Sequence, residues 1–315
     1  MRILLTGGSG QVGHALKGSL QGLGELVVAD RSQMDLSKPD QIRAAIRSVK
    51  PVLIINPAAY TAVDKAESEP ELAQSINGDA PGIIAEEAAR LGAALIHYST
   101  DYVFDGSKRD ADGRLAAYTE QDTPSPVNTY GKTKLAGEQA IAASGCAHLI
   151  FRTSWVYSRF GQNFLLTMLR LANERDALRI VNDQWGAPTW AGWIAQATAD
   201  IVQRLAAGKQ AGQSTLDLET WRQNSGIYNM STLGCTNWCG FAEAVIGQAV
   251  SLGLLNKAAP SITGIPSADY PTPAARPLNS MLSMDLLMSR FQIQPPQWDE
   301  AMRACLQDAG PASAS

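Results

Sequence analysis

Two side chains that could transfer a proton, Tyr130 and Lys134, are four residues apart in a segment, 126–143, that the sequence predicts to be helical. Residues spaced by four lie on the same face of a helix, so an ammonium group would stand beside a phenol. A neighbouring positive charge favours the phenolate and would lower the tyrosine pKa from its ordinary value of about 10. Such a phenol could donate a proton to a substrate oxygen, and the lysine could also bind ribose hydroxyls.

A hydroxyl-bearing segment, Ser99-Thr100-Asp101, directly follows an apolar run at 93–98 that predicts a buried strand. Ligands of open α/β sheets bind beyond the carboxyl ends of the strands, so the Thr100 hydroxyl could hold a substrate carbonyl against Tyr130. Thr100 alone could equally be a turn or cap residue, and a Tyr-x-x-x-Lys pair also arises by chance. The strand-end hydroxyl and the Tyr130/Lys134 pair together favour catalysis, with Thr100, Tyr130 and Lys134 as its residues.

Three glycines, Gly7, Gly10 and Gly13, separate the first apolar run from a helical segment that contains Gln11 and Val12. Gly7 would allow a sharp turn, Gly10 would let a pyrophosphate approach the backbone, and Gly13 would let helix and strand pack closely. The N-terminus of the helix would offer free N–H groups to an anion. Because the spacing differs from G-x-G-x-x-G, a simple turn is the alternative. The place of the loop after the first strand favours a dinucleotide.

The second strand is expected to end at Asp30, next to Arg31. A carboxylate there accepts hydrogen bonds from the adenosine ribose and repels a 2′-phosphate, whereas an arginine can pair with that phosphate. A plain surface pair is the alternative reading. The two residues favour NADH and NADPH respectively, and the cofactor preference stays open. The small residues Ala58 and Ala59 after the third strand would let the cofactor lie close to the backbone.

The elements that must position these residues alternate between strand and helix in the first half. Apolar runs predict strands at 3–5, 26–29, 52–55, 93–98 and 148–151, and helices at 11–20 and 39–49 lie among the segments between them. Apolar runs without alternation indicate strands buried on both faces. The pattern predicts an α/β fold, a Rossmann-type doubly wound parallel sheet. Residues 1–155 would form the NAD(P)-binding domain, to which parts of 178–230 return.

The second half is rich in glycine and proline, and we expect 156–315 to form mainly a smaller C-terminal substrate-binding domain, a cap over the sheet. A polar loop is expected at 208–213 and a frayed tail after residue 310. Trp155 could stack on a sugar or base, Asn163 could reach the substrate, and Arg276 could grip a diphosphate. Their alternatives are a core residue, a helix cap and a surface salt bridge.

Composition excludes several classes of partner. The net charge of −4 argues against nucleic acid and membrane surfaces, and no apolar stretch is long enough to span a bilayer. The spacing of the four cysteines suggests neither a disulfide framework nor a zinc site, which fits a cytoplasmic protein. The three histidines, His14, His97 and His148, are scattered and are expected to be structural.

Seven segments give the chain a family resemblance. They are LLTGGSGQVG, NPAAYTAVDKAE, STDYVFDG, SPVNTYGKTKLAGE, FRTSWVY, NDQWGAPT and YPTPAARPLNS. Taken together, they resemble the extended short-chain dehydrogenase/reductases and, within them, the dTDP-4-dehydrorhamnose reductases. The resemblance covers nearly the whole chain. It implies NADH- or NADPH-dependent reduction of the 4-keto group of dTDP-4-dehydro-L-rhamnose.

Residue by residue, the resemblance implies that both ligands contact motif positions of this chain. Cofactor contacts are implied at Gly10, Gln11, Val12, Asp30, Asp35, Leu36, Ala59, Tyr60, Thr61, Tyr130 and Lys134. Substrate contacts are implied at Thr100, Asp101 and Trp155, and we expect further ones at Val103, Tyr130, Asn163 and Arg276.

Some family members are dimers with Mg²⁺ held by glutamates, one of them in the first helix. This chain has Ala15 and Lys17 in that helix and no glutamate, so we predict no metal, whereas a homodimer stays an expectation. A nucleotide-sugar epimerase or dehydratase is the rival enzyme; a dehydratase would need an acidic pair after Thr100, and Asp101-Tyr102 supplies one acid. A non-catalytic regulatory subunit, like the β subunit of methionine adenosyltransferase, is the rival from another class.

Overall fold

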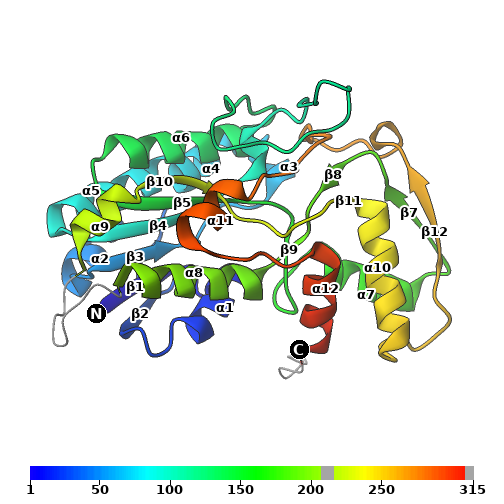
Figure 1. Cartoon of the computed structure of the whole chain (residues 1–315), viewed down its shortest axis with the longest axis horizontal. Coiled ribbons are helices and arrows are strands. Elements are labelled where there is room, and N and C mark those ends of the chain that lie inside the picture. The colour runs from blue at the N-terminus through cyan, green and yellow to red at the C-terminus, as the bar shows by residue number, and fades with distance from the viewer. Residues whose placement is uncertain (207–215, 309–315) are drawn as a thin grey trace.

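The computed structural model describes residues 1–206 and 216–308 of the chain; the predicted polar loop at 208–213 and the tail after 310 lie outside them. Its centre is a six-stranded parallel sheet in the order β10-β5-β4-β3-β1-β2 (Figure 1). The strands are β1 (Arg2–Thr6), β2 (Glu25–Ala29), β3 (Leu53–Asn56), β4 (Ala94–Thr100), β5 (Ala147–Thr153) and β10 (Gly226–Asn229). The predicted doubly wound α/β fold is confirmed.

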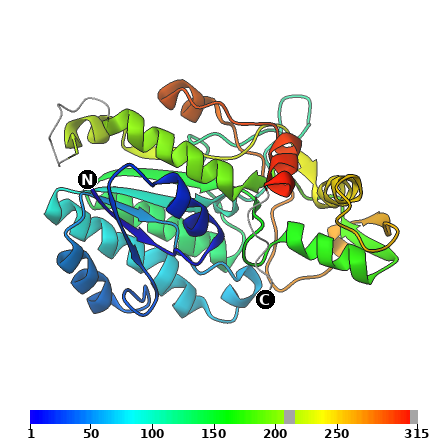
Figure 2. The same ribbon diagram turned by 90° about the horizontal axis from the view of Figure 1, so that it is seen from below.

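Alternate residues of the strands fill two apolar layers, since successive side chains of a strand point to opposite faces. Ile3, Leu5 and Ile96 face one layer, whereas Leu4 and Leu95 face the other. Figure 2 shows α8 on one face and α2 and α5 on the other. The first face is covered by α1 (Gln11–Ser19), α8 (Ala191–Ala206), α9 (Leu218–Gln223) and α11 (Asp285–Phe291). The second is covered by α2 (Pro39–Val49), α5 (Ala80–Leu91) and α6 (Thr129–Ala143).

Helix α2 is fastened to α5 by a buried carboxylate. Glu87, 2% exposed, accepts hydrogen bonds from Arg43, Arg47 and Arg90. The guanidinium of Arg47 in the first place, and those of the other two arginines, lower the pKa of Glu87 to about 2. The ion pairs from α2 to Glu87 therefore hold α2 against α5 as long as Glu87 is ionised.

The second half contributes to both parts of the molecule. Strand β10 and helix α8 belong to the sheet and its cover, whereas a separate apolar cluster lies beyond one end of the sheet (Figures 1 and 2). That cluster includes residues of α7 (Phe164–Glu174), β7 (Ala177–Val181), α10 (Trp238–Ser251), β12 (Ser261–Ile265) and α12 (Trp298–Gln307). The division at residue 155 into two domains stays a prediction.

Short elements complete the described chain. The two-residue strands are β6 (Val156–Tyr157), β8 (Trp185–Gly186), β9 (Thr189–Trp190) and β11 (Thr236–Asn237). The short helices are α3 (Val63–Ala66), α4 (Pro70–Gln74), η1 (Ser75–Asp79), η2 (Asp101–Val103) and η3 (Ser267–Asp269). None of the helices in the described ranges combines the length and apolar character that crossing a bilayer requires.

Candidate active site

A cavity of about 950 Å³ opens at the carboxyl ends of the parallel strands, between the sheet and the second half of the chain. That volume lies at the upper end of what small-molecule sites usually enclose. The predicted site residues that line it are Gly7, Gly10, Gln11, Val12, Gly13, Asp30, Arg31, Asp35, Leu36, Ala58, Ala59, Thr61, Thr100, Asp101, Tyr130, Lys134, Trp155, Asn163 and Arg276. The fold therefore gathers these nineteen residues at one site.

The glycine loop between β1 and α1 has room for a pyrophosphate. Gly7 has φ +59°, and a Cβ there would lie 2.9 Å from the backbone of Ala58. A Cβ on Gly13 would lie 2.0 Å from the Gly7 carbonyl, so helix and strand pack there without side chains. Gly10 caps α1, and a Cβ added there would approach the Gly7 carbonyl oxygen to 3.4 Å, an ordinary contact. The loop thus exposes backbone N–H groups to the cavity, as dinucleotide binding requires.

Asp30 and Arg31 lie together at the end of β2. The Ser32 hydroxyl, with the backbone N–H groups of Gln33 and Ser32, donates to Oδ1 of Asp30 and lowers its pKa. The carboxylate is therefore ionised, and its Oδ2 can accept from a ribose. Arg31 is 79% exposed and lies 3.6 Å from Asp35, a weak surface pair. Both residues fit the adenosine end of a dinucleotide.

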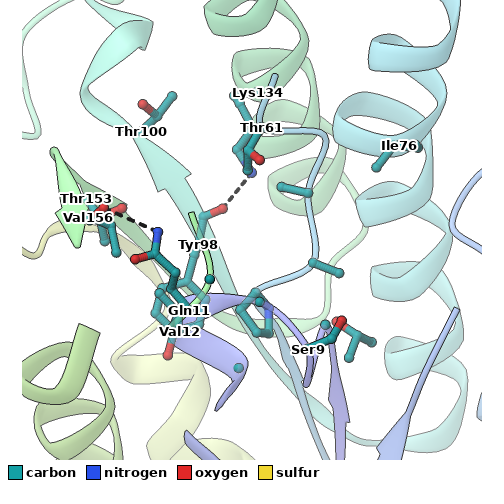
Figure 3. Close-up of a pocket in the computed structure, with 18 of the residues that line it drawn as sticks. Ser9, Gln11, Val12, Thr61, Ile76, Tyr98, Thr100, Lys134, Thr153 and Val156 are labelled. Atoms are coloured by element: carbon teal, nitrogen blue, oxygen red, sulfur yellow. Dashed lines mark hydrogen bonds between the residues drawn. The ribbon is translucent and has the colours of Figure 1, made fainter. Parts of the chain in front are cut away.

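Tyr130, Lys134 and Thr100 all line the cavity, two from α6 and one from the end of β4, and the Thr100 hydroxyl is hydrogen-bonded to Tyr130. Figure 3 shows Lys134 and Thr100 in the cavity. Lys134 is buried and donates to the Tyr98 carbonyl at 2.6 Å. The Thr100 hydroxyl lies 3.0 Å from Oδ1 of Asp101 and accepts from the Tyr102 backbone at 3.1 Å. This is the arrangement expected of a proton donor, its charged neighbour and a carbonyl-orienting hydroxyl.

Burial dominates the electrostatics of this centre. It raises the pKa of Tyr130, as does the Asp101 carboxylate, whereas the Thr100 hydroxyl lowers it. The predicted depression of the Tyr130 pKa by Lys134 is thus wrong for the structure, because loss of hydration and the Asp101 carboxylate set the direction of the shift. Burial also lowers the pKa of Lys134 to about 8 and raises that of Asp101 to about 6. A tyrosine with a raised pKa keeps its proton at neutral pH, as a proton donor must.

Two indoles form a wall at the other end of the cavity. Trp155 has a left-handed φ of +48° and stacks on Trp238 with ring centroids 3.6 Å apart. A Cβ on Gly186 would lie 2.9 Å from the Trp155 ring, so the ring rests against bare backbone. Trp238 is in turn fixed by a hydrogen bond from its Nε1 to Gln184 at 3.1 Å. Backbone strain of this kind persists only where the surroundings determine it, and here Trp238 and Gly186 hold the Trp155 ring in place at the cavity.

Asn163 and Arg276 both line the cavity, and each also makes the structural contact that was its alternative, a helix cap and a salt bridge respectively. Asn163 caps α7 by accepting from Leu166 N, and it also donates to Gln11 Oε1 at 2.9 Å beside the cofactor loop. Arg276 lines the cavity while its guanidinium pairs with both oxygens of Asp64, at 3.1 and 2.8 Å. The salt bridge therefore orients Arg276 at the cavity and does not remove it.

Comparison with known proteins places the chain in a family. The family model described as RmlD substrate binding domain matches residues 1–310. A dTDP-4-dehydrorhamnose reductase from Burkholderia thailandensis is 44% identical over 309 residues, 98% of this chain and 99% of its own. The chain belongs to this family.

Solved structures of family members have the same fold. A dTDP-4-dehydrorhamnose reductase from Clostridium acetobutylicum superposes with a TM-score of 0.83 at 30% identity, covering 97% of this chain and 98% of the other. The Bacillus anthracis enzyme, solved in complex with NADP, gives the same TM-score and coverage at 29% identity. Both superpositions extend over nearly the whole chain and therefore include the sheet and the second half.

Two of the predicted site residues lie elsewhere. Tyr60 is not among the residues that line the cavity, and its hydroxyl donates to Glu69. Val103 is fully buried in a small cluster with Phe104, Tyr118 and Leu282. The helix that carries Tyr130 begins at Thr129 and not at 126, because Asn128 caps it by accepting from Gly131 N at 2.8 Å.

Several lining residues were not predicted, among them Ser9, Ile76, Tyr102, Val156, Phe164 and Trp238. Trp238 is the most consequential, and its segment contains only a cap-like Thr-Asn before an apolar helix. That pattern predicts the start of α10 and gives no sign of the contact with Trp155. Within residues 1–206 and 216–308, no three His, Cys, Asp or Glu side chains are grouped so that they could hold a metal ion.

Proposed function

We propose that the chain uses NADH or NADPH to reduce the 4-keto group of dTDP-4-dehydro-L-rhamnose, which gives dTDP-L-rhamnose. The observation that carries this proposal is the single cavity that joins the glycine loop, the Thr100/Tyr130/Lys134 centre and the Trp155/Arg276 end. The family membership supports the substrate, since relatives at about 42% identity over nearly their full length are named dTDP-4-dehydrorhamnose reductase.

The cofactor, when bound, supplies the hydride, and the chain's own residues do the rest. The Thr100 hydroxyl, which donates to Asp101 in the chain without substrate, turns its one proton to the keto oxygen and orients that oxygen toward Tyr130. Tyr130 gives that oxygen its phenolic proton, and the neighbouring Lys134 ammonium stabilises the phenolate left behind. Lys134 has three N–H groups, and with the Tyr98 carbonyl and His97 as neighbours one of them is left to hold a ribose hydroxyl.

The substrate end is proposed to read the nucleotide diphosphate and the sugar. Asp101 is buried with one carboxylate oxygen, Oδ2, that has no partner in the described chain, and it can accept from a sugar hydroxyl. Trp155 can stack its ring face on a sugar or base, and Arg276 can pair its charge with the diphosphate. We further propose that residues 1–155, with returns from 178–230, bind the cofactor and that 156–315 mainly bind the sugar.

The test is oxidation of NADH and NADPH across a panel of nucleotide keto-sugars. Turnover with dTDP-4-dehydro-L-rhamnose and release of oxidised cofactor are expected. An epimerase or dehydratase would instead retain its cofactor through the cycle, and a regulatory subunit would show no turnover.

The setting of the enzyme is proposed as cytoplasmic, and its assembly as a homodimer. All four cysteines are free, as in a reducing compartment. The family resemblance supports the dimer. Light scattering of the purified chain measures its mass, and a monomer at micromolar concentration would contradict it.

A further inference from the structure

A row of buried polar side chains lies behind Lys134 and crosses three strands of the sheet. The Lys134 Nζ is 3.3 Å from Nε2 of His97 on β4, whose Nδ1 is 3.1 Å from Nδ2 of Asn56 on β3. Oδ1 of Asn56 accepts from the Thr6 hydroxyl on β1 at 2.5 Å. All four side chains are at most 2% exposed. The register of β3 and β4 pairs Asn56 with His97, so these two side chains lie next to each other on one face of the sheet.

Hydrogen-bond chemistry fixes the form of the His97 ring. An ammonium group can only donate, so Lys134 bonds to Nε2 of His97 only if that nitrogen carries no proton. The ring is neutral, because burial and the adjacent Lys134 hold its pKa well below the usual range. Its one proton is therefore on Nδ1 and must be donated to Asn56. A half-turn of the Asn56 amide brings its oxygen to the Nδ1–H of His97 and its NH₂ to the Thr6 hydroxyl, which then accepts from Asn56 and no longer donates to it.

Among the side chains of the described residues, His97 is the only hydrogen-bond partner of Lys134. Glu138, one turn further along α6, forms a buried pair with Arg152 of β5 at 2.6 and 2.9 Å. Tyr98 contributes its carbonyl only, and its hydroxyl bonds to Thr198. Tyr130 and Asp101 lie on the cavity side. With the Tyr98 carbonyl and His97 holding two N–H groups, the third is aimed at the cavity.

We propose that His97 is a positioning residue, which as its Nδ1–H tautomer accepts a hydrogen bond from Lys134 and holds the ammonium group toward the cofactor and Tyr130. This role rests on the proposed function of Lys134. It replaces the expectation that His97 is merely structural. A histidine that only filled the core would have no effect on the properties of Lys134.

The first test needs no substrate. The chain has three histidines, so ¹⁵N–¹H correlation spectra of their side chains can be assigned with His14 and His148 replaced in turn. The Nδ1–H tautomer of His97 is expected at pH 7. An Nε2–H tautomer or a protonated ring would overturn the proposal, whatever the enzyme reduces.

The second test compares two variants with a matched control. His97→Leu removes the acceptor, whereas His97→Gln keeps an amide oxygen that can reach Lys134. The leucine variant is expected to lose about tenfold or more in kcat and in NADPH affinity, the worth of one hydrogen bond to a charged group, with the sugar KM nearly unchanged. The glutamine variant should recover most of the loss. His148→Gln, which alters a histidine bonded to the Cys146 carbonyl away from the cavity, should equal the wild type.

The pH profile separates positioning from packing. Loss of the acceptor disfavours the ammonium form of Lys134, so the alkaline limb of kcat should move to lower pH in His97→Leu and return in His97→Gln. Equal losses in both variants with an unmoved limb would refute the proposal. If His97→Leu does not fold, the wild-type tautomer and the glutamine variant still decide it. NADPH affinity is measured without sugar, so failure of the proposed substrate would not be mistaken for failure of this role.

Discussion

Replacing Arg276 by alanine is expected to weaken binding of the nucleotide sugar and leave the cofactor alone. The guanidinium has five N–H groups, and three of them are used on Asp64 and the Ala274 carbonyl. Nε–H and one Nη2–H are thus available to a diphosphate in the described chain. Losing one charge-assisted contact costs about 1.5–3 kcal/mol, which raises the sugar KM roughly 10- to 150-fold.

The ion pair with Asp64 makes the experiment sharper. Without Arg276, the Asp64 carboxylate is left unpaired beside the cavity and repels the diphosphate, so part of the loss is repulsion. Contacting charged pairs couple by about 0.5–3 kcal/mol. The sugar KM of the double variant Arg276→Ala/Asp64→Asn should therefore be lower than that of Arg276→Ala by about twofold or more.

The assay is steady-state NADPH oxidation at varied sugar concentration, with NADPH affinity measured by fluorescence. Arg179→Ala is the matched control, since Arg179 forms an exposed pair with Asp269 at 3.8 Å and does not line the cavity. An unchanged sugar KM in folded Arg276→Ala would place the diphosphate elsewhere. Equal losses for sugar and cofactor would point to misfolding and would also count against the reasoning.

Three further predictions concern the proton donor, the cofactor and stability. Tyr130→Phe should lower kcat by roughly 10²–10⁴ with NADPH still bound, and near-normal turnover would remove Tyr130 from the reaction. Asp30→Ala should shift the kcat/KM ratio toward NADPH and Arg31→Ala toward NADH; a ratio unmoved by both would mean that the ribose lies elsewhere. Glu87, with its pKa lowered to about 2, contributes stability above its ordinary pKa of 4.5 that is lost as pH falls toward 2. Glu87→Gln should thus lower the free energy of unfolding by at most about 3 kcal/mol at pH 7 in urea titrations, with the difference from wild type vanishing near pH 2; a constant difference would contradict the linkage.

Five of the six strands of the sheet and the cofactor loop were predictable because they depend on local sequence, whereas β10 (Gly226–Asn229) was not predicted as a strand. The apolar run 93–98 predicts β4 to within two residues, and Gly7 has the positive φ that a sharp turn needs. The start of α6 was misplaced, because a cap at Asn128 decides it and Pro126 does not take part.

The sequence could not predict how deeply side chains are buried or which residues far apart in the chain touch each other. The spacing of Tyr130 and Lys134 shows that they share a helix face but not that burial raises the pKa of the first and lowers that of the second. His97 reaches Lys134 only through the packing of α6 on β4, and Trp238 reaches Trp155 only through the cap. Neither contact has a signature in its own segment.

The stacked indoles of Trp155 and Trp238 have an optical consequence. Two chromophores held face to face at 3.6 Å do not absorb independently, because their excited states couple. Among the aromatic pairs of the described chain, this is the one that joins two tryptophans. The pair should give a circular dichroism couplet that disappears in Trp238→Phe and changes when a ligand displaces either ring. The protein thus carries a built-in optical reporter for occupancy of the Trp155/Trp238 end of its cavity, readable without label and without turnover.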